Sequence, residues 1–230
     1  MSNKTTYFVT SVFFVGKCLS ESTYDECNSA YYNKNTEHAF AHVGRVASVA
    51  ENILRTLGYP ERDAELAKIA AWLHDIGNLV NRKDHAQSGA LMAQQILVRL
   101  GMSYHEVAAV VAAIGHHDES VAEPVTPIAA ALIIADKADV RRTRVRREED
   151  GTVDETTFDM HDRVNYSAVK TRVQVSAQEK TLWLNIEIDT RYSSVMEFFE
   201  AFLSRMQLCR RACEKLGLVF RMNINDTAII

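Results

Sequence analysis

Seven side chains of the types that bind transition metals are spread over about a hundred positions of the sequence. They are five imidazoles and two carboxylates: His42, His74, Asp75, His85, His116, His117 and Asp136. Imidazole and carboxylate without thiolate suit iron, manganese, cobalt, nickel or zinc better than calcium or magnesium. One ion normally takes fewer ligands than this. The set therefore predicts two divalent ions roughly 3.5–4 Å apart, with iron or manganese favoured over zinc, nickel and cobalt.

The segment Leu66–Asn78, LAKIAAWLHDIGN, places two of these residues at the end of an apolar helix. Its apolar residues recur at helical spacing and lead directly into His74 and Asp75. Gly77 stands where a glycine would let the chain leave the helix. A carboxylate on so apolar a segment must be paired, protonated or bound to a cation, because an isolated buried charge is very costly. The His-Asp pair recurs at His161-Asp162, which we place in a linker and discount.

Five predicted helices would carry the seven residues. Helical patterns cover residues 38–57, 60–77, 85–100 and 103–116, and a fifth helix begins at Pro127 and carries Asp136. Asp84 is expected to cap the third helix, and Ser103 with Glu106 the fourth. The fifth helix is apolar on every side, which makes it central. Bundles of this kind build metal sites from inward-facing side chains on several helices.

The order H…HD…H…HH…D resembles the HD superfamily of metal-dependent phosphohydrolases, in its dinuclear subset. Five segments across residues 38–142 carry the resemblance: HVGRVA, LHDIGN, HAQSGA, GHHDE and IIADKAD. The resemblance implies a helical HD domain with one ion on His42, His74 and Asp136. It assigns a second ion to His85, His116 and His117, with Asp75 as the bridge. His74 and Asp75 would then stand at the catalytic centre, where a hydroxide activated by the ions attacks phosphorus.

The chain departs from this pattern in two respects. Asn78 replaces the common lysine of HDIGK, and the GYP segment of the phosphodiesterase branch is absent, so cyclic di-GMP is not supported as substrate. The short gap between Asp75 and His85 favours compact substrates.

Several assignments stay open at this level. His38 lies one helical turn before His42 and could exchange roles with it. His116 and His117 could be one ligand and one substrate contact. Neutral imidazole ligands need an acceptor for their other nitrogen, and the sequence does not assign one.

Basic residues close to the ligands in sequence are candidates for contacting a substrate phosphate. They are Arg82, Lys83, Lys137, Arg141 and Arg144. The last two belong to a basic run that is expected to continue the helix of Asp136. The alternative is that this run is only a solvated face.

Composition limits the partners and the compartment. The chain has 230 residues, 47% hydrophobic and 24% charged, and a net charge of −4, so no whole-chain argument favours nucleic acid or a membrane. Its four cysteines fit no zinc or redox spacing, which favours the cytoplasm. Residues 5–16 are apolar but too short to span a membrane, and we expect a strand or a docked extension there.

The fold class is mainly α, with three parts. An N-terminal extension (1–37) precedes an HD helical bundle (38–148) and a small α+β module (149–230). In this module a linker over 148–162 leads to a hairpin of strands 169–176 and 182–188, a helix over 193–216 and a strand over 218–224. This β-β-α-β module could cover the site, bind an effector or support a homodimer.

The sequence thus predicts a metal-dependent phosphohydrolase that cleaves a phosphate mono- or diester in a nucleotide or related phosphometabolite. One alternative is an HD-type di-iron oxygenase, which uses a similar ligand set. The other is a non-catalytic metal-binding sensor.

Overall fold

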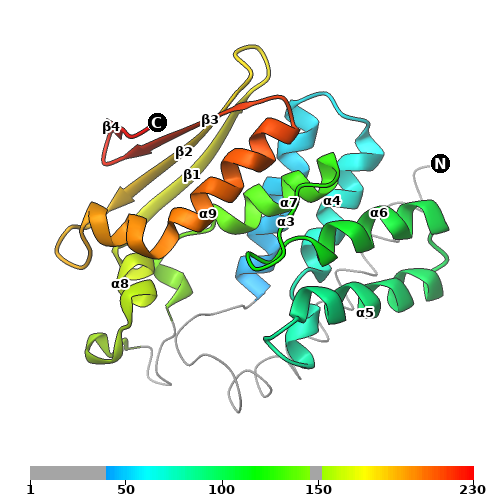
Figure 1. Ribbon diagram of the computed structural model, residues 1–230, viewed down its shortest axis with the longest axis horizontal. Helices are drawn as coiled ribbons and strands as arrows, with labels where there is room; N and C mark the ends of the chain where they lie inside the picture. The colour runs from blue at the N-terminus through cyan, green and yellow to red at the C-terminus, as the bar shows by residue number, and fades with distance from the viewer. Residues whose placement is uncertain (1–39, 146–151) are drawn as a thin grey trace.

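The computed structural model describes residues 40–145 and 152–230. It is mainly helical and ends in a small α+β module, as the sequence predicted (Figure 1). The strand or extension expected at residues 5–16, and the alternative ligand His38, lie outside the described residues. No helix in the described part of the chain is long and apolar enough to cross a membrane.

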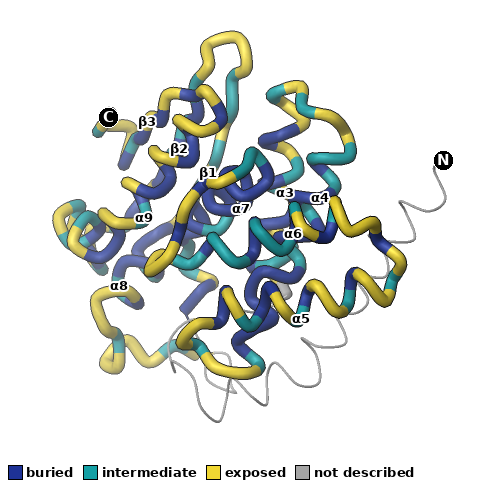
Figure 2. Tube along the Cα trace, turned by 45° about the vertical axis from the view of Figure 1, so that its right-hand side comes forward, coloured by how far each residue is buried: buried dark blue, intermediate teal, exposed yellow. Residues whose placement is uncertain are grey.

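Five helices form the first part of the structure. They are α3 (Phe40–Thr56), α4 (Glu61–Leu73), α5 (His85–Arg99), α6 (Tyr104–Gly115) and α7 (Pro127–Lys137). Helix α7 packs against α3, α4 and α6, and its residues from Ile128 to Ala135 are all buried. Figure 2 shows this helix as a buried segment in the middle of the molecule. The expectation of a central fifth helix is therefore confirmed, and the helix that bears Asp136 is held from several sides.

Two of the three predicted helix starts form as expected. The Ser103 hydroxyl accepts a hydrogen bond from the Glu106 N–H at the start of α6, and Pro127 opens α7 behind Thr126. The prediction for Asp84 was wrong. Its side chain makes no capping bond, because its backbone takes a left-handed conformation (φ 58°) as the chain enters α5.

Helix α4 ends at Leu73, before the position predicted from Gly77. His74 and Asp75 leave the helix, and a 3-10 turn, η2 (Ile76–Leu79), follows. Gly77 serves close packing and does not end the helix. A Cβ atom there would lie 1.9 Å from the His85 carbonyl oxygen and 2.6 Å from the Gly89 nitrogen. The absence of a side chain thus lets η2 rest directly on α5.

The second part contains one four-stranded sheet and two helices. Its elements are η4 (Glu155–Thr157), α8 (Met160–Ser167), β1 (Ala168–Ser176), β2 (Thr181–Ile188), α9 (Val195–Lys215), β3 (Val219–Ile224) and β4 (Thr227–Ala228). The strand order is β1-β2-β3-β4, with β2 and β3 parallel and the other pairs antiparallel. The predicted β-β-α-β pattern is confirmed, because α9 is the crossover between β2 and β3. The linker expected over 148–162 was partly wrong, since it contains η4 and the start of α8.

The two parts share a continuous apolar core. Helix α9 packs against both the sheet and α7 (Figure 1). Its Phe198, Phe202 and Cys209 are fully buried. On the sheet, alternate residues such as Leu184 and Met222 are also buried. The C-terminal module therefore supports α7, and with it the position of Asp136.

Candidate metal centre

Three predicted ligands from three helices converge in the core. His42 lies in the first turn of α3, His74 follows α4, and Asp136 lies in the last turn of α7. The Nε2 atom of His42 is 3.3 Å from Asp136 Oδ1, and the Nε2 atom of His74 is 3.8 Å from the same oxygen. Ligand atoms of these three residues, here called the first group, all lie within 4.8 Å of one another and could hold a metal ion.

A second group lies on the other side of His74 and consists of Asp75, His85 and His117. His85 Nε2 is 3.3 Å from Asp75 Oδ1 and 3.2 Å from His117 Nε2. His74, Asp75 and His117 also lie close enough to hold an ion. Asp75 directs Oδ2 toward His74 at 3.4 Å and Oδ1 toward His85 and His117. The carboxylate therefore lies between the two groups, as a bridging ligand must.

Backbone carbonyls fix the orientation of the imidazoles. The Nδ1 atom of His74 donates to the Ala71 oxygen at 2.7 Å, that of His85 to the Arg82 oxygen at 3.0 Å, and that of His117 to the Ile114 oxygen at 2.6 Å. With Nδ1 engaged by a carbonyl, Nε2 is the ring nitrogen that faces the other ligands and is available to a metal. This is the arrangement that metal-binding histidines adopt.

The surroundings of the His74 Nε2 atom give the strongest indication that this site binds a cation. It is fully buried and makes no hydrogen bond within the described residues. It instead faces carboxylate oxygens of Asp75 and Asp136 at 3.4 and 3.8 Å. Burial lowers the pKa of His74 to about 4, so the ring is neutral near pH 7. A lone pair that faces two carboxylates is unfavourable unless a cation lies between them, so these residues fit a metal ion.

His116 is not a member of either ligand group found among the described residues. Its side chain is half-buried and its Nδ1 donates back to the Ala112 carbonyl at 2.9 Å. Helix α6 ends at Gly115, so both histidines lie just beyond its last residue. Within the described residues, His117 alone of this pair joins a candidate ligand set.

Asp139 is a functional candidate that the sequence analysis missed. Its Oδ2 accepts a hydrogen bond from His42 Nδ1 at 2.7 Å, which directs His42 Nε2 toward Asp136. Burial would raise the pKa of Asp139, but the bond to His42 and the nearby Arg144 and Arg141 lower it to about 2. Its place three residues after Asp136 was the available signal, since i and i+3 share a helix face.

The five basic candidates occupy different environments. Arg82 is partly exposed, and its Nη1 atom lies 3.3 Å from His85 Nε2 and 3.8 Å from Asp75 Oδ1. Lys137 is buried and donates to Asp136 Oδ2 at 2.7 Å. Arg141 donates to Asp139 Oδ1 at 2.8 Å. No side-chain contact of Lys83 is found in the described part of the chain, and its side chain is exposed.

The expectation that the basic run continues the helix of Asp136 was wrong. Helix α7 ends at Lys137, Arg141 is extended, and a separate 3-10 turn, η3 (Arg142–Arg144), follows. This break turns the Arg144 side chain into the protein, where it is buried beside His42.

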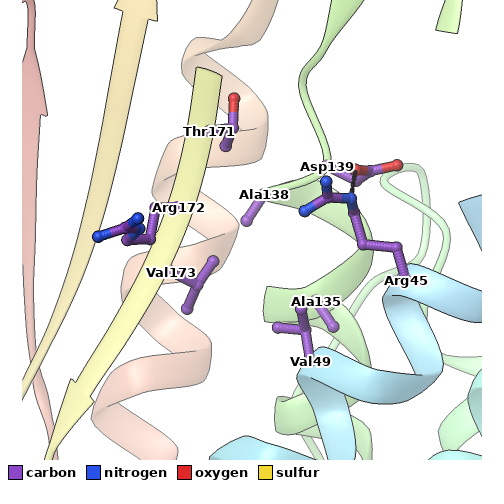
Figure 3. A pocket seen from close by; sticks show the side chains of 8 residues that line it. All are labelled: Arg45, Val49, Ala135, Ala138, Asp139, Thr171, Arg172 and Val173. Carbon is purple, nitrogen blue, oxygen red and sulfur yellow. Dashed lines mark ion pairs between the residues drawn. The ribbon is translucent and has the colours of Figure 1, made fainter. Parts of the chain in front are cut away.

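A cavity of about 220 Å³ lies behind Asp139, between α3, the end of α7 and β1 (Figure 3). Arg45 points from α3 toward the carboxylate, with its Nε 3.5 Å from Asp139 Oδ1. None of the seven predicted ligands lines this cavity. Asp139, which lines the cavity, also accepts the hydrogen bond from His42 Nδ1.

Residues that were set aside have structural roles. Asp162 completes a capping box with Asp159 at the start of α8, and the His161 ring packs against Phe202. Cys209 and Cys213 are buried free thiols on α9, and burial raises the pKa of Cys209 to about 12.

The C-terminal module also holds the loop that follows His117. The side chains of Ser204 and Arg205 on α9 donate to the Glu119 carboxylate at 3.1 and 2.6 Å. Glu119 is therefore engaged with α9. Asp118 stays near the second group, with its Oδ1 3.9 Å from His85 Nε2.

Comparisons with known proteins identify a family for residues 39–143. None of the curated proteins matches the chain, whereas seven chains of solved structures do. One is the crystal structure of a predicted HD superfamily hydrolase from an uncultured Thermotogales bacterium, 26% identical over 57% of this chain and 68% of that chain, with a TM-score of 0.46. The model of the HD domain family matches residues 39–143, which include all seven predicted ligands. Residues 39–143 are therefore an HD domain, and the chain is an HD-domain protein.

Proposed function

We propose that this protein is a metal-dependent phosphohydrolase that uses a dinuclear centre to cleave a phosphate ester in a nucleotide or related phosphometabolite. The observation that carries the proposal is the buried Nε2 of His74, which makes no hydrogen bond within the described residues and faces two carboxylates in the core of an HD domain. Such an atom requires a cation, and ligands converge on both sides of it.

The residues present divide between two ions. His42, His74 and Asp136 would hold the first, and His85 and His117 the second, with Asp75 between them. When bound, such a pair of cations supplies an activated hydroxide and neutralises the phosphoryl oxygens, which is most of what phosphoryl transfer requires. The assignment leaves His116 outside the ligand set.

Arg82 has the best position to contact a substrate phosphate. Its side chain is 40% exposed, whereas its guanidinium lies beside His85 and Asp75 of the second group. It also donates to the Oδ1 atom of Asn78 at 3.3 Å, and Asn78 is the residue that replaces the family lysine. Guanidinium groups match phosphate oxygens in geometry and charge. A substrate would therefore approach from the Arg82 side, and Arg82 would orient its phosphate toward the second group.

Lys137 would act from the opposite side. Its buried ammonium donates to Asp136 Oδ2, which directs Oδ1 toward His42 and His74. Burial by itself would raise the pKa of Asp136, but Lys137 and His42 hold it well below its usual value. Asp136 is therefore ionised, as a ligand must be.

The test uses purified protein of known metal content and mono-, di- and cyclic nucleotides as substrates. The release of phosphate and of monoester is measured in the absence of oxygen. We expect turnover that requires added Mn²⁺ or Fe²⁺ and falls at least about 100-fold in Asp75→Asn and His117→Ala. His105→Ala is the matched control, because His105 is an exposed histidine on α6.

Each contrary result has a distinct meaning. A reaction that requires oxygen and releases no phosphate would favour the oxygenase instead. Tight metal binding without turnover of any substrate would favour the sensor. Full activity in folded Asp75→Asn would overturn the proposed site.

A further inference from the structure

The cavity beside Asp139 combines an apolar lining with a charged end. It lies where both parts of the structure meet, between α3, the end of α7 and β1. The charged end is formed by Arg45 and Asp139, which lie together in Figure 3. The apolar side chains of the lining are Val49, Ala135, Ala138 and Val173. A ligand that matches this lining carries one charged group on a small apolar body.

The volume of about 220 Å³ limits the size of that ligand. A dry cavity of about 150 Å³ binds benzene, so this one has room for about eight or nine non-hydrogen atoms. A nucleotide has far more atoms and does not fit. The cavity is therefore not a second site for the substrate class proposed above.

Positive charge exceeds negative charge at the charged end. Three guanidinium groups contact the single carboxylate of Asp139. The Nε atoms of Arg141 and Arg45 lie 2.8 and 3.5 Å from its Oδ1, and Nη1 of Arg144 lies 3.6 Å from its Oδ2. Within residues 40–145 and 152–230, none of these arginines pairs with another carboxylate. The excess of positive charge favours an anion as the charged group of the ligand.

Arg45 is the arginine that can bind this anion. It lines the cavity, and its side chain is 50% exposed, so it can leave its long contact with Asp139 at little cost. The Thr171 hydroxyl also lines the cavity, but it donates its proton to the Val140 carbonyl. One guanidinium matches the two oxygens of one carboxylate, whereas a phosphate dianion needs more donors. The charged end therefore fits a monocarboxylate.

Arg172 lines the same cavity but has a different orientation. Its guanidinium lies on the other side of β1 from Arg45 (Figure 3). This follows from the alternation of side chains along a strand, because Thr171 and Val173 point toward the cavity. Arg172 is therefore a matched control for Arg45.

Asp139 connects the cavity with the candidate metal centre. Its Oδ2 accepts the hydrogen bond from His42 Nδ1, and His42 Nε2 lies 3.3 Å from Asp136 Oδ1 in the first group. An anion beside Asp139 makes the electrostatic potential at His42 more negative, which favours a cation at the first group. By linkage, the cation then favours the anion by the same factor.

We propose that this cavity is an effector site for a small monocarboxylic acid with a short apolar chain. The carboxylate pairs with Arg45, and the chain lies against Val49, Ala135 and Val173. The effector and a divalent ion at the first group strengthen each other's binding through Asp139 and His42. This site goes beyond the proposed function and does not depend on hydrolysis. Its coupling to the metal rests on the candidate metal centre.

The experiment measures binding of butyrate, hexanoate and decanoate to metal-free protein by calorimetry and ligand-observed nuclear magnetic resonance. Affinity should rise up to about fourfold for each added methylene until hexanoate fills the cavity, and decanoate should gain little more. Hexanamide, which has the same size and no charge, should bind at least about tenfold more weakly than hexanoate. Inorganic phosphate should not displace hexanoate.

Variants locate the site. Arg45→Met should weaken hexanoate binding at least about tenfold, whereas Arg172→Met should leave it unchanged. Val49→Phe fills the cavity and should abolish binding. If Val49→Phe does not fold, Val173→Leu replaces it. Arg82→Met should bind hexanoate as the native protein does, because the anion does not bind beside the second ligand group.

A Mn²⁺ titration with and without saturating hexanoate tests the coupling. Hexanoate should tighten Mn²⁺ binding about threefold or more, and Arg45→Met should remove this effect. An equal effect in Arg45→Met would mean that the carboxylate binds the ion directly, and would reject the coupling. Unchanged Mn²⁺ affinity in the native protein would reject it as well.

The site itself is overturned if hexanoate binds no better than hexanamide, if folded Arg45→Met binds it normally, or if Arg82→Met loses it. Failure to hydrolyse any nucleotide would reject the proposed function and leave this site intact. Nucleotide hydrolysis without hexanoate binding would reject only the effector site.

Discussion

The replacement Gly77→Ala should damage both the stability of the fold and the metal centre. Its new Cβ would lie 1.9 Å from the His85 carbonyl oxygen, where real Cβ atoms stay beyond 3.0 Å, so η2 and α5 must separate by about 1.1 Å. The obstructing atoms belong to the backbone, including the Gly89 nitrogen at 2.6 Å, and cannot rotate away. Overpacking usually costs about 1–3 kcal/mol, and we expect a loss of about 3 kcal/mol or more in the free energy of unfolding.

Two other glycines give a graded control. At Gly89 the added Cβ would be 3.1 Å from the Gly77 nitrogen, so a shift of a few tenths of an ångström suffices. A helix gains up to about 1 kcal/mol from glycine to alanine, which offsets this cost. At Gly115 the nearest atom is the Ala90 Cβ at 3.7 Å, an ordinary contact. Gly115→Ala should therefore be neutral or slightly stabilising, and Gly89→Ala intermediate.

Urea denaturation of the three variants measures these free energies, and a Mn²⁺ titration measures the effect on the site. Because separation of η2 from α5 moves His85 away from Asp75, Gly77→Ala should also weaken Mn²⁺ binding in whatever protein remains folded. If Gly77→Ala is within 1 kcal/mol of the native protein, or Gly115→Ala is the most damaging change, the described packing of η2 on α5 is incorrect.

Three further predictions concern the ligands and the substrate. Burial lowers the pKa of His74 from 6.5 to about 4. Metal-free protein should therefore keep the full contribution of the neutral His74 ring to its free energy of unfolding above pH 6.5, and lose about 3 kcal/mol of it as the pH falls toward 4. Urea denaturation should show the loss as a shift of the midpoint, and His74→Gln should reduce that shift. His117→Ala should weaken Mn²⁺ binding at least about tenfold and His116→Ala much less, and calorimetry giving the reverse order would assign His116 as the ligand. Arg82→Met should raise KM for a phosphorylated substrate more than it lowers kcat, and an unchanged KM would exclude the proposed phosphate contact.

The sequence by itself determined the helices and the chemical type of the site. Apolar periodicity defined three of the five bundle helices closely, α3, α5 and α6, and correctly made α7 central, because the free energy of burial fixes which face of a helix turns inward. Imidazoles and carboxylates on those inward faces predicted a transition-metal site, since few other arrangements compensate for the cost of burying such groups. Period-two alternation likewise gave the β-β-α-β order of the C-terminal module.

Local signals failed where another segment decides the conformation. Gly77 was interpreted as a helix terminator, whereas its neighbour across space is the backbone of α5. Asp84 has the residue type of a cap but a left-handed backbone, and the end of α4 came earlier than its apolar pattern indicated.

Only the tertiary structure decided which side chains meet. His116 and His117 are neighbours in the sequence and both follow the end of α6, but among the described residues only His117 belongs to a candidate ligand group, with its Nε2 3.9 Å from Asp75 Oδ1. Asp139 and Arg144 lie about a hundred residues from His42, yet both contact its ring. Such pairings depend on how α3 packs against α7 and on the break before η3, because a contact between distant segments is set by the whole core and not by the spacing of nearby residues.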